Sequence, residues 1–200
     1  MTDAYTVYWN TDRWLGALSV GHRPLPVLFG GPHLSEPSFR RAGVKVGDLI
    51  YPVAVANRRV HVVARMQVRE MLLLGQEDGP TLIDLRFPEY RAWKFLAPTC
   101  TDEVIIGING TPPRVDLEVP REMLDRLRFR SQRGERGLKH LKDGELASTS
   151  GLLGIYRLTP ESAADFDELI SSPVPEAAAR IPWPTKAGDR RVIITEPPLF

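Results

Sequence analysis

The residues best suited to chemistry in this sequence lie in one basic segment, residues 126–142. The segment holds seven basic residues against the single acid Glu135, a net charge of +6, while the whole chain carries only +1. Guanidinium groups suit phosphate because their planar fork offers two parallel donors. The predicted phosphate-binding residues are Arg126, Arg128, Arg130, Arg133, Arg136, Lys139 and His140. The alternative interpretation is a solvated basic loop, flexible around its glycines and balanced by acids on a neighbouring face.

Aromatic residues form a second group of candidates. Their rings can stack on bases, a contact worth about 1–3 kcal/mol per base. A base turned out of its stack also needs partners at its edge, and the Asn10 amide offers both a donor and an acceptor. The competing interpretation is that these rings pack in the core and at its rim. The aromatic candidates are Tyr8, Trp9, Trp14, Trp93 and Trp183.

No motif in the sequence compels an enzymatic mechanism. The four histidines show no metal-ligand spacing with one another or with Cys100, so no metal site is predicted. His61 is expected to satisfy a hydrogen bond on a sheet face. Asp102 and Glu103 are adjacent in a predicted strand and point to opposite faces, so they do not easily share a proton. No phosphate-binding glycine loop occurs, and no cofactor is predicted.

Composition favours short strands and ordered loops as the elements that position these residues. The 200 residues include 18 prolines and 16 glycines, and 42% of them are hydrophobic. The single cysteine excludes an internal disulfide and indicates a reducing compartment. The polar start at Met1–Ala4 predicts no signal peptide, and no apolar run reaches the length of a membrane helix. We therefore expect a cytoplasmic protein.

The strongest structural signal runs from Gly43 to Val68. Apolar residues alternate over 49–55 and again over 60–68, which is the period of a strand. Asn57 suits the turn between these strands because asparagine tolerates positive φ. The first strand is apolar on both faces, which predicts that the hairpin lies inside a barrel or sandwich.

The rest of the chain predicts further short elements around this hairpin. A helix capped by Asp12 is expected to end at Gly16, and residues 21–37 are expected to form a long loop. A cap at Thr159 followed by proline predicts the clearest helix. The other expected elements are strands at 5–9, 81–85, 103–108, 114–119, 152–158 and 191–195, one helical turn at 38–42, and helices at 87–96 and 120–127.

Together these patterns predict an α+β fold, a small and mostly antiparallel β-barrel with two or three flanking helices. The expected domain covers residues 1–172 and contains the basic segment 126–142 as an insertion. Residues 173–200 form a proline-rich extension that can end in a barrel strand.

The N-terminal third of the chain resembles the PUA-like superfamily, with EVE and YTH members closest in character. The resemblance is carried by Tyr8, Trp9, Trp14, Gly43, Lys45, Gly47, Asp48 and Tyr51. It implies a pseudo-barrel that binds nucleic acid and holds a flipped base in an aromatic pocket, here Tyr8, Trp9, Asn10 and Trp14. The related ASCH motif is close to G-x-K-x-x-E-x-R, and this chain has Asp48 and Ile50 at its last two fixed positions. That departure counts against ASCH activities, including a nuclease role.

The leading hypothesis is a non-catalytic nucleic-acid-binding protein, for RNA or DNA, that grips the backbone through the basic segment. One alternative is an enzyme acting on nucleotides or nucleic acid, with His140, Glu135 or Asp102 as acid–base groups. Another is a protein-interaction or self-assembly module that docks through residues 173–184 and 197–200.

Overall fold

The computed structural model describes residues 2–32, 37–74, 88–96 and 101–174 of the chain. At its centre lies strand β3 (Leu49–Ala56), which pairs in parallel with β1 (Ala4–Tyr8). On its other side β3 pairs antiparallel with β4 (Arg59–Val62) and with β5 (Met66–Leu73). The chain is thus organised around the hairpin that the alternating pattern predicts.

This hairpin confirms the predicted turn and corrects the second strand. Asn57 and Arg58 have φ angles of 48° and 65°, as a two-residue type I′ turn requires. The expected strand over 60–68 is interrupted, so that β4 and β5 are separate. At the interruption the Arg65 N–H donates to Thr111 Oγ1 rather than to a neighbouring strand.

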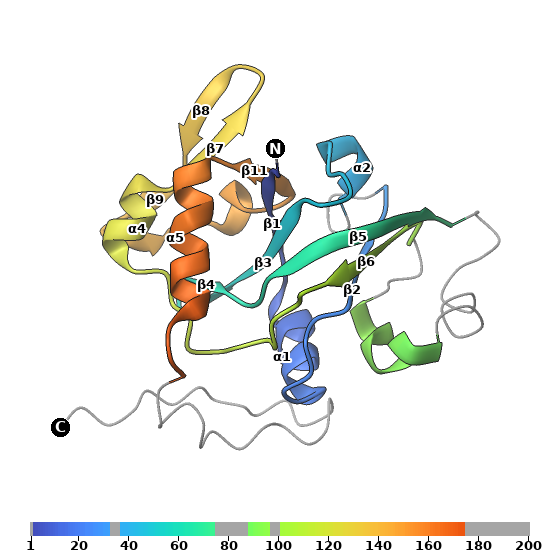
Figure 1. The fold of residues 1–200 in the computed structure, drawn as a ribbon. Helices are drawn as coiled ribbons and strands as arrows, with labels where there is room; N and C mark the ends of the chain where they lie inside the picture. The colour runs from blue at the N-terminus through green and yellow to red at the C-terminus, as the bar shows by residue number, and fades with distance from the viewer. Residues whose placement is uncertain (1, 33–36, 75–87, 97–100, 175–200) are drawn as a thin grey trace.

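The remaining strands extend one large, mostly antiparallel sheet in the order β2-β6-β5-β3-β1-β11-β7-β8, with β4 paired to β3 outside this path. The added strands are β2 (Val27–Gly30), β6 (Glu103–Ile108), β7 (Arg128–Ser131), β8 (Gly134–Gly137) and β11 (Ile155–Leu158), while β9 (Leu141–Lys142) and β10 (Glu145–Leu146) form a separate pair. The α+β class is confirmed, but the described strands do not close into the predicted barrel. Their order is open, with β2 and β8 at its ends, and β7 pairs with β11 at only two positions (Figure 1).

Two hydrophobic clusters bury opposite faces of the central strands. Along β3, Ile50 and Ala54 belong to one cluster while Tyr51 and Val53 belong to the other. This alternation confirms that the first strand of the hairpin is covered on both faces. The first cluster is completed by α1 (Thr11–Ser19), α2 (Phe39–Ala42) and the 3₁₀ helix η1 (Pro88–Leu96), and the second by α4 (Arg121–Arg126) and α5 (Pro160–Ser171).

Helix α1 departs from the sequence prediction at both ends. Its N-cap is Asn10, whose side chain accepts from the Arg13 N–H at 2.9 Å, and not Asp12. The helix also continues past Gly16 to Ser19. Glycine is needed there because a Cβ would lie 2.6 Å from a ring carbon of Phe95. Gly16 therefore marks a close approach between α1 and η1 and not the end of a helix.

Elsewhere most predicted elements are confirmed. The turn at 38–42 is α2, capped by Ser38, and α5 begins with the Thr159 cap and Pro160 as expected. Strand β2 lies inside the predicted loop 21–37, and the expected strand at 114–119 is reduced to a single bridge between His61 and Glu118. The short 3₁₀ helix η2 spans Thr149–Gly151.

Some predictions fall outside the described residues, namely the strands at 81–85 and 191–195 and the extension from residue 175 onward. The domain boundary near residue 172 therefore stays a prediction. None of the helices in the described ranges combines the length and apolar character needed to cross a membrane.

Candidate nucleic-acid interface

The centre of the basic segment folds as a β-hairpin rather than as a flexible loop. Strands β7 and β8 pair from Arg128↔Gly137 to Ser131↔Gly134. Gly134, with φ of +105°, follows the turn, and the Ser131 hydroxyl donates to its carbonyl oxygen at 2.8 Å. The hairpin projects from the body of the molecule beyond β11 (Figure 1).

One face of the hairpin packs on the protein. Phe129 is 1% exposed, and its ring centroid lies 5.5 Å from that of Tyr156. Arg136 pairs with Phe129 in the β7–β8 register, and its guanidinium lies 4.6 Å from the centroid of the same Tyr156 ring. This cation–π contact keeps Arg136 against the body of the protein. The opposite face of the hairpin carries Arg130 and Glu135, both exposed.

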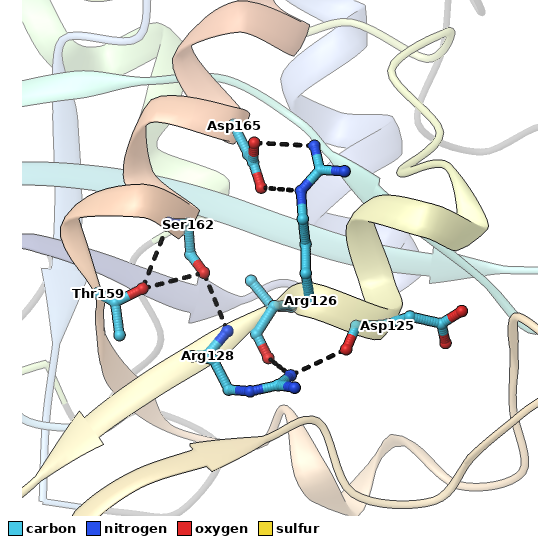
Figure 2. A network of polar contacts seen from close by, with 7 residues as sticks. Asp125, Arg126, Arg128, Thr159, Ser162 and Asp165 are labelled. Atoms are coloured by element: carbon cyan, nitrogen blue, oxygen red, sulfur yellow. Dashed lines mark hydrogen bonds and ion pairs between the residues drawn. The ribbon is translucent and has the colours of Figure 1, made fainter.

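Two of the predicted phosphate ligands hold the base of the hairpin instead (Figure 2). Arg126 donates from Nε and Nη2 to the two carboxylate oxygens of Asp165, at 2.7 and 2.9 Å. This bond raises the pKa of Arg126 above its ordinary value. Arg128 donates from Nη1 to the carbonyl oxygens of Asp125 and Leu127, each at 2.9 Å.

The backbone at the start of β7 is fixed by α5. The Arg128 N–H donates to Ser162 Oγ at 2.9 Å, and Ser162 is itself bonded to the Thr159 cap (Figure 2). Together with the Arg126–Asp165 pair, this network joins α4, β7 and α5. Arg126 and Arg128 therefore set the direction of the hairpin, and their charges are already engaged by the chain.

The tip and the chain that follows hold the free cations of the segment. Arg130, Arg133, Lys139 and Lys142 are exposed. Within the described ranges, none of these four forms an ion pair. His140 is also exposed, in a left-handed turn with φ of 59° just before β9. By contrast, other arginines are matched to acids, as in Arg65–Asp167, Arg114–Asp116 and Arg58–Glu145.

The predicted base pocket lies at the other end of the molecule. Helix α1, which carries Trp14, lies at the end opposite the β7–β8 hairpin (Figure 1). Trp9 and Trp14 are each 2% exposed, and the Trp14 indole N–H donates to the Arg114 carbonyl oxygen at 3.0 Å. Asn10 caps α1, and burial raises the pKa of Tyr8. A base can stack on either indole only if the core opens here, so the pocket stays a prediction.

Groups considered for catalysis have structural roles or stand apart. Glu103 is 2% exposed, and its carboxylate accepts from the Ser38 hydroxyl and the Phe39 N–H at the start of α2. The His61 ring packs 5.0 Å from that of Trp14, and burial lowers its pKa. Its Nδ1 is buried and has no hydrogen-bond partner among the described residues. In the described ranges, no three histidine, cysteine or acidic residues gather as a metal site would require.

Sequence reasoning missed one arginine that the fold places beside the hairpin. Arg157 on β11 lies directly opposite Arg130 on β7. The sequence did contain a signal for it, because Arg157 is the only charged residue in the apolar stretch 152–158. A charged residue in an otherwise apolar strand indicates either the edge of a sheet or a binding site.

Comparison with known proteins adds a likeness of fold. No family model matches the chain, and no curated protein matches its sequence. Among solved structures, ASCH from Zymomonas mobilis has 9% identity and a TM-score of 0.45, covering 83% of this chain and 94% of that one. A single-residue variant of the Zymomonas protein gives 8% identity and a TM-score of 0.43, covering 83% and 97%.

The chain is structurally similar to ASCH domain proteins, a branch of the PUA-like superfamily. At this identity and TM-score the likeness concerns the general course of the chain, and no functional residue is transferred from it. Kinship with the EVE and YTH branch stays a prediction.

Proposed function

We propose that this protein binds the backbone of a nucleic acid through the tip of the β7–β8 hairpin and the turn that follows. The observation that supports this most is the set of exposed cations Arg130, Arg133, Lys139 and Lys142, for which the described chain supplies no ion pair. Cations left unpaired on a projecting element are available to phosphates, and each phosphate contact releases condensed counterions.

The arginines of the segment differ in their contacts, and this difference favours an ordered binding surface over a solvated loop. Arg126 and Arg128 are held by Asp165 and by backbone carbonyls, and Phe129 anchors one face in the core. This support leaves Arg130 and Arg133 on a rigid hairpin rather than on a disordered segment. A preorganised guanidinium loses less freedom on binding phosphate than one carried by a mobile chain.

Backbone binding predicts little sequence preference and a strong salt dependence. Phosphate contacts position a protein on nucleic acid but carry no sequence information of their own. Whether a base is also read at the Trp9 end of β1 is a separate hypothesis. The hairpin lies at the opposite end of the molecule, so the two ideas can be tested independently.

The test is fluorescence anisotropy of labelled mixed-sequence RNA and DNA oligonucleotides over a series of salt concentrations. The Arg130→Ala/Arg133→Ala variant should bind every sequence more weakly and show a slope of log affinity against log salt reduced by about 1.4 for single strands. The matched control is Arg23→Ala/Arg69→Ala, which removes two exposed arginines from elsewhere on the chain. Equal affinities for the two double variants, or no binding by the wild-type protein, would refute the proposal.

A further inference from the structure

Two arginines face each other across strands at the edge of the core. In the sheet register, Tyr5 on β1 lies opposite Arg157 on β11, and Arg157 lies opposite Arg130 on β7. Residues directly opposed in an antiparallel pair share one face, with Cβ atoms about 4.5–5.5 Å apart. Like charges in such a position destabilise a sheet. An anion held between the two guanidinium groups removes this repulsion.

Arg157 is held in place by its surroundings. Its Nε donates to the Tyr5 hydroxyl at 3.1 Å, and this hydroxyl donates in turn to the Gly43 carbonyl oxygen at 3.1 Å. The guanidinium also lies 5.4 Å from the centroid of the Tyr5 ring, which is completely buried. The Arg157 side chain is 37% exposed, so a fixed guanidinium meets solvent where the buried face of the sheet ends.

Two acids lie close to this arginine pair without forming short ion pairs with it. Asp3 contacts Arg157 Nη1 through one oxygen at 3.5 Å, a long contact with a single carboxylate oxygen. Glu135 lies opposite Arg130 in the register but forms no ion pair with it. These two acids face the two arginines of the pair, and further cations come from α2.

Helix α2 brings two more arginines to the same end of the molecule. Arg40 and Arg41 are exposed and, within the described part of the chain, form no ion pair. The helix contacts β11, and a Cβ added at Gly43, just after it, would lie 3.5 Å from Arg157 Nη2. Figure 1 shows α2 and the β7–β8 hairpin on either side of the start of β1. Cations from three elements therefore adjoin one another.

We propose that Arg157 and Arg130 form a phosphate subsite, and that a bound nucleic-acid strand runs from the hairpin tip over β11 to α2. This inference rests on the proposed function and extends its footprint to residues outside the basic segment. The guanidinium group of Arg157, held in a fixed orientation, donates to one phosphodiester group, and the guanidinium group of Arg130 contacts the same phosphate from the hairpin. Arg40 and Arg41 contact the next part of the backbone.

The test compares Arg157→Gln, Arg130→Gln and Arg40→Gln/Arg41→Gln with the control Arg69→Gln, using the same oligonucleotides and salt series. Loss of a charged hydrogen-bonding partner predicts about tenfold weaker binding for Arg157→Gln. Its salt slope should fall by about 0.7 per lost phosphate contact for single strands. Tyr5→Phe removes the positioning hydroxyl but no charge, so it should weaken binding while the salt slope stays that of the wild type. The α2 variant changes only exposed residues and keeps the test valid if Arg157→Gln fails to fold.

A second readout needs no ligand. Arg130→Gln also removes the attraction of Arg130 to Glu135, which lies opposite it, so the comparison is made in a Glu135→Gln background. There Arg130→Gln removes the repulsion with Arg157 and should raise the melting temperature in low salt, and the difference should vanish in high salt. Wild-type binding by both the Arg157 and the α2 variants, while Arg130→Ala/Arg133→Ala binds weakly, would overturn the subsite and leave the hairpin proposal intact. If Arg130→Ala/Arg133→Ala also binds normally, both proposals fail.

Discussion

Replacing Glu103 with glutamine is expected to destabilise the protein strongly although it exchanges only one oxygen for an amino group. Glu103 begins β6, is 2% exposed, and accepts from Ser38 Oγ at 2.5 Å and from the Phe39 N–H at 2.7 Å. The Arg40 N–H approaches the same carboxylate at 3.3 Å. These groups form the start of α2, where backbone donors have no partner inside the helix. The carboxylate therefore ties α2 to the sheet.

The magnitude follows from the kind of hydrogen bond that is lost. A bond to a charged group contributes about 1.5–3 kcal/mol, and a neutral one about 0.5–1.5 kcal/mol. Glu103→Gln can keep both short bonds as neutral ones, with its amide donating to Ser38, so the expected loss is about 2–3 kcal/mol. Glu103→Ala also leaves the Phe39 N–H buried without an acceptor and opens a cavity, and the expected loss is about 4 kcal/mol.

Urea unfolding of the wild type and the two variants measures these losses. The control is Glu118→Gln, since the Glu118 side chain is 48% exposed and has a single 3.5 Å contact with Arg59. That variant should stay within about 0.5 kcal/mol of the wild type. If Glu103→Gln were no less stable than the Glu118 control, the carboxylate would not be holding α2, and the reasoning would be refuted.

Three other changes test interactions elsewhere in the fold. Burial and the hydrogen bond to Asp167 raise the pKa of Tyr51, so the folded state keeps a proton that the unfolded chain loses above about pH 10. The free energy of unfolding should therefore decrease as the pH rises above about 10, and urea titrations should show a smaller decrease for Tyr51→Phe than for the wild type. Burial lowers the pKa of His61, so stability should fall as the pH drops below about 6.5, and His61→Gln should reduce that fall between pH 7 and 5. The Arg114 side chain is only 12% exposed, pairs with Asp116 and donates to backbone carbonyl oxygens at the end of α5 and just after it. Arg114→Ala should therefore lower the free energy of unfolding in urea by about 3–5 kcal/mol, and a loss below about 1 kcal/mol would contradict this.

The sequence predicted those parts of the fold whose causes are local. The continuous apolar run over 49–55 matches the burial of both faces of β3, and the positive φ of Asn57 is a property of the turn itself. The Thr159 cap and the proline after it fix the start of α5 within a few residues. These signals can be recognised in the sequence because each depends on residues that are close together in the chain.

The errors arise where a distant partner decides the outcome. Gly16 looks like a helix terminator, yet Phe95 from η1 explains it. Arg126 looks like a phosphate ligand until α5 brings Asp165 to it. The contacts of Arg126 and Arg128 at the base of the β7–β8 hairpin likewise join segments far apart in the sequence.

The candidate site was predicted in composition but not in geometry. Charge asymmetry pointed to the basic segment, and Arg130 and Arg133 are exposed on its hairpin. Arg157 escaped notice because its role comes from strand register, which joins residues far apart in sequence. Nothing in the sequence indicated that the β7–β8 hairpin and α1, which carries Trp14, lie at opposite ends of the molecule (Figure 1).

The most direct test of the hairpin interface is an NMR titration of the labelled full chain with a mixed-sequence oligonucleotide. Guanidinium signals of Arg130, Arg133 and Arg157 should shift as the nucleic acid is added, and those of Arg126 should stay in place because Asp165 already holds it. Shifts confined to α1 and the region around Trp14, with the hairpin signals unchanged, would contradict the proposed interface.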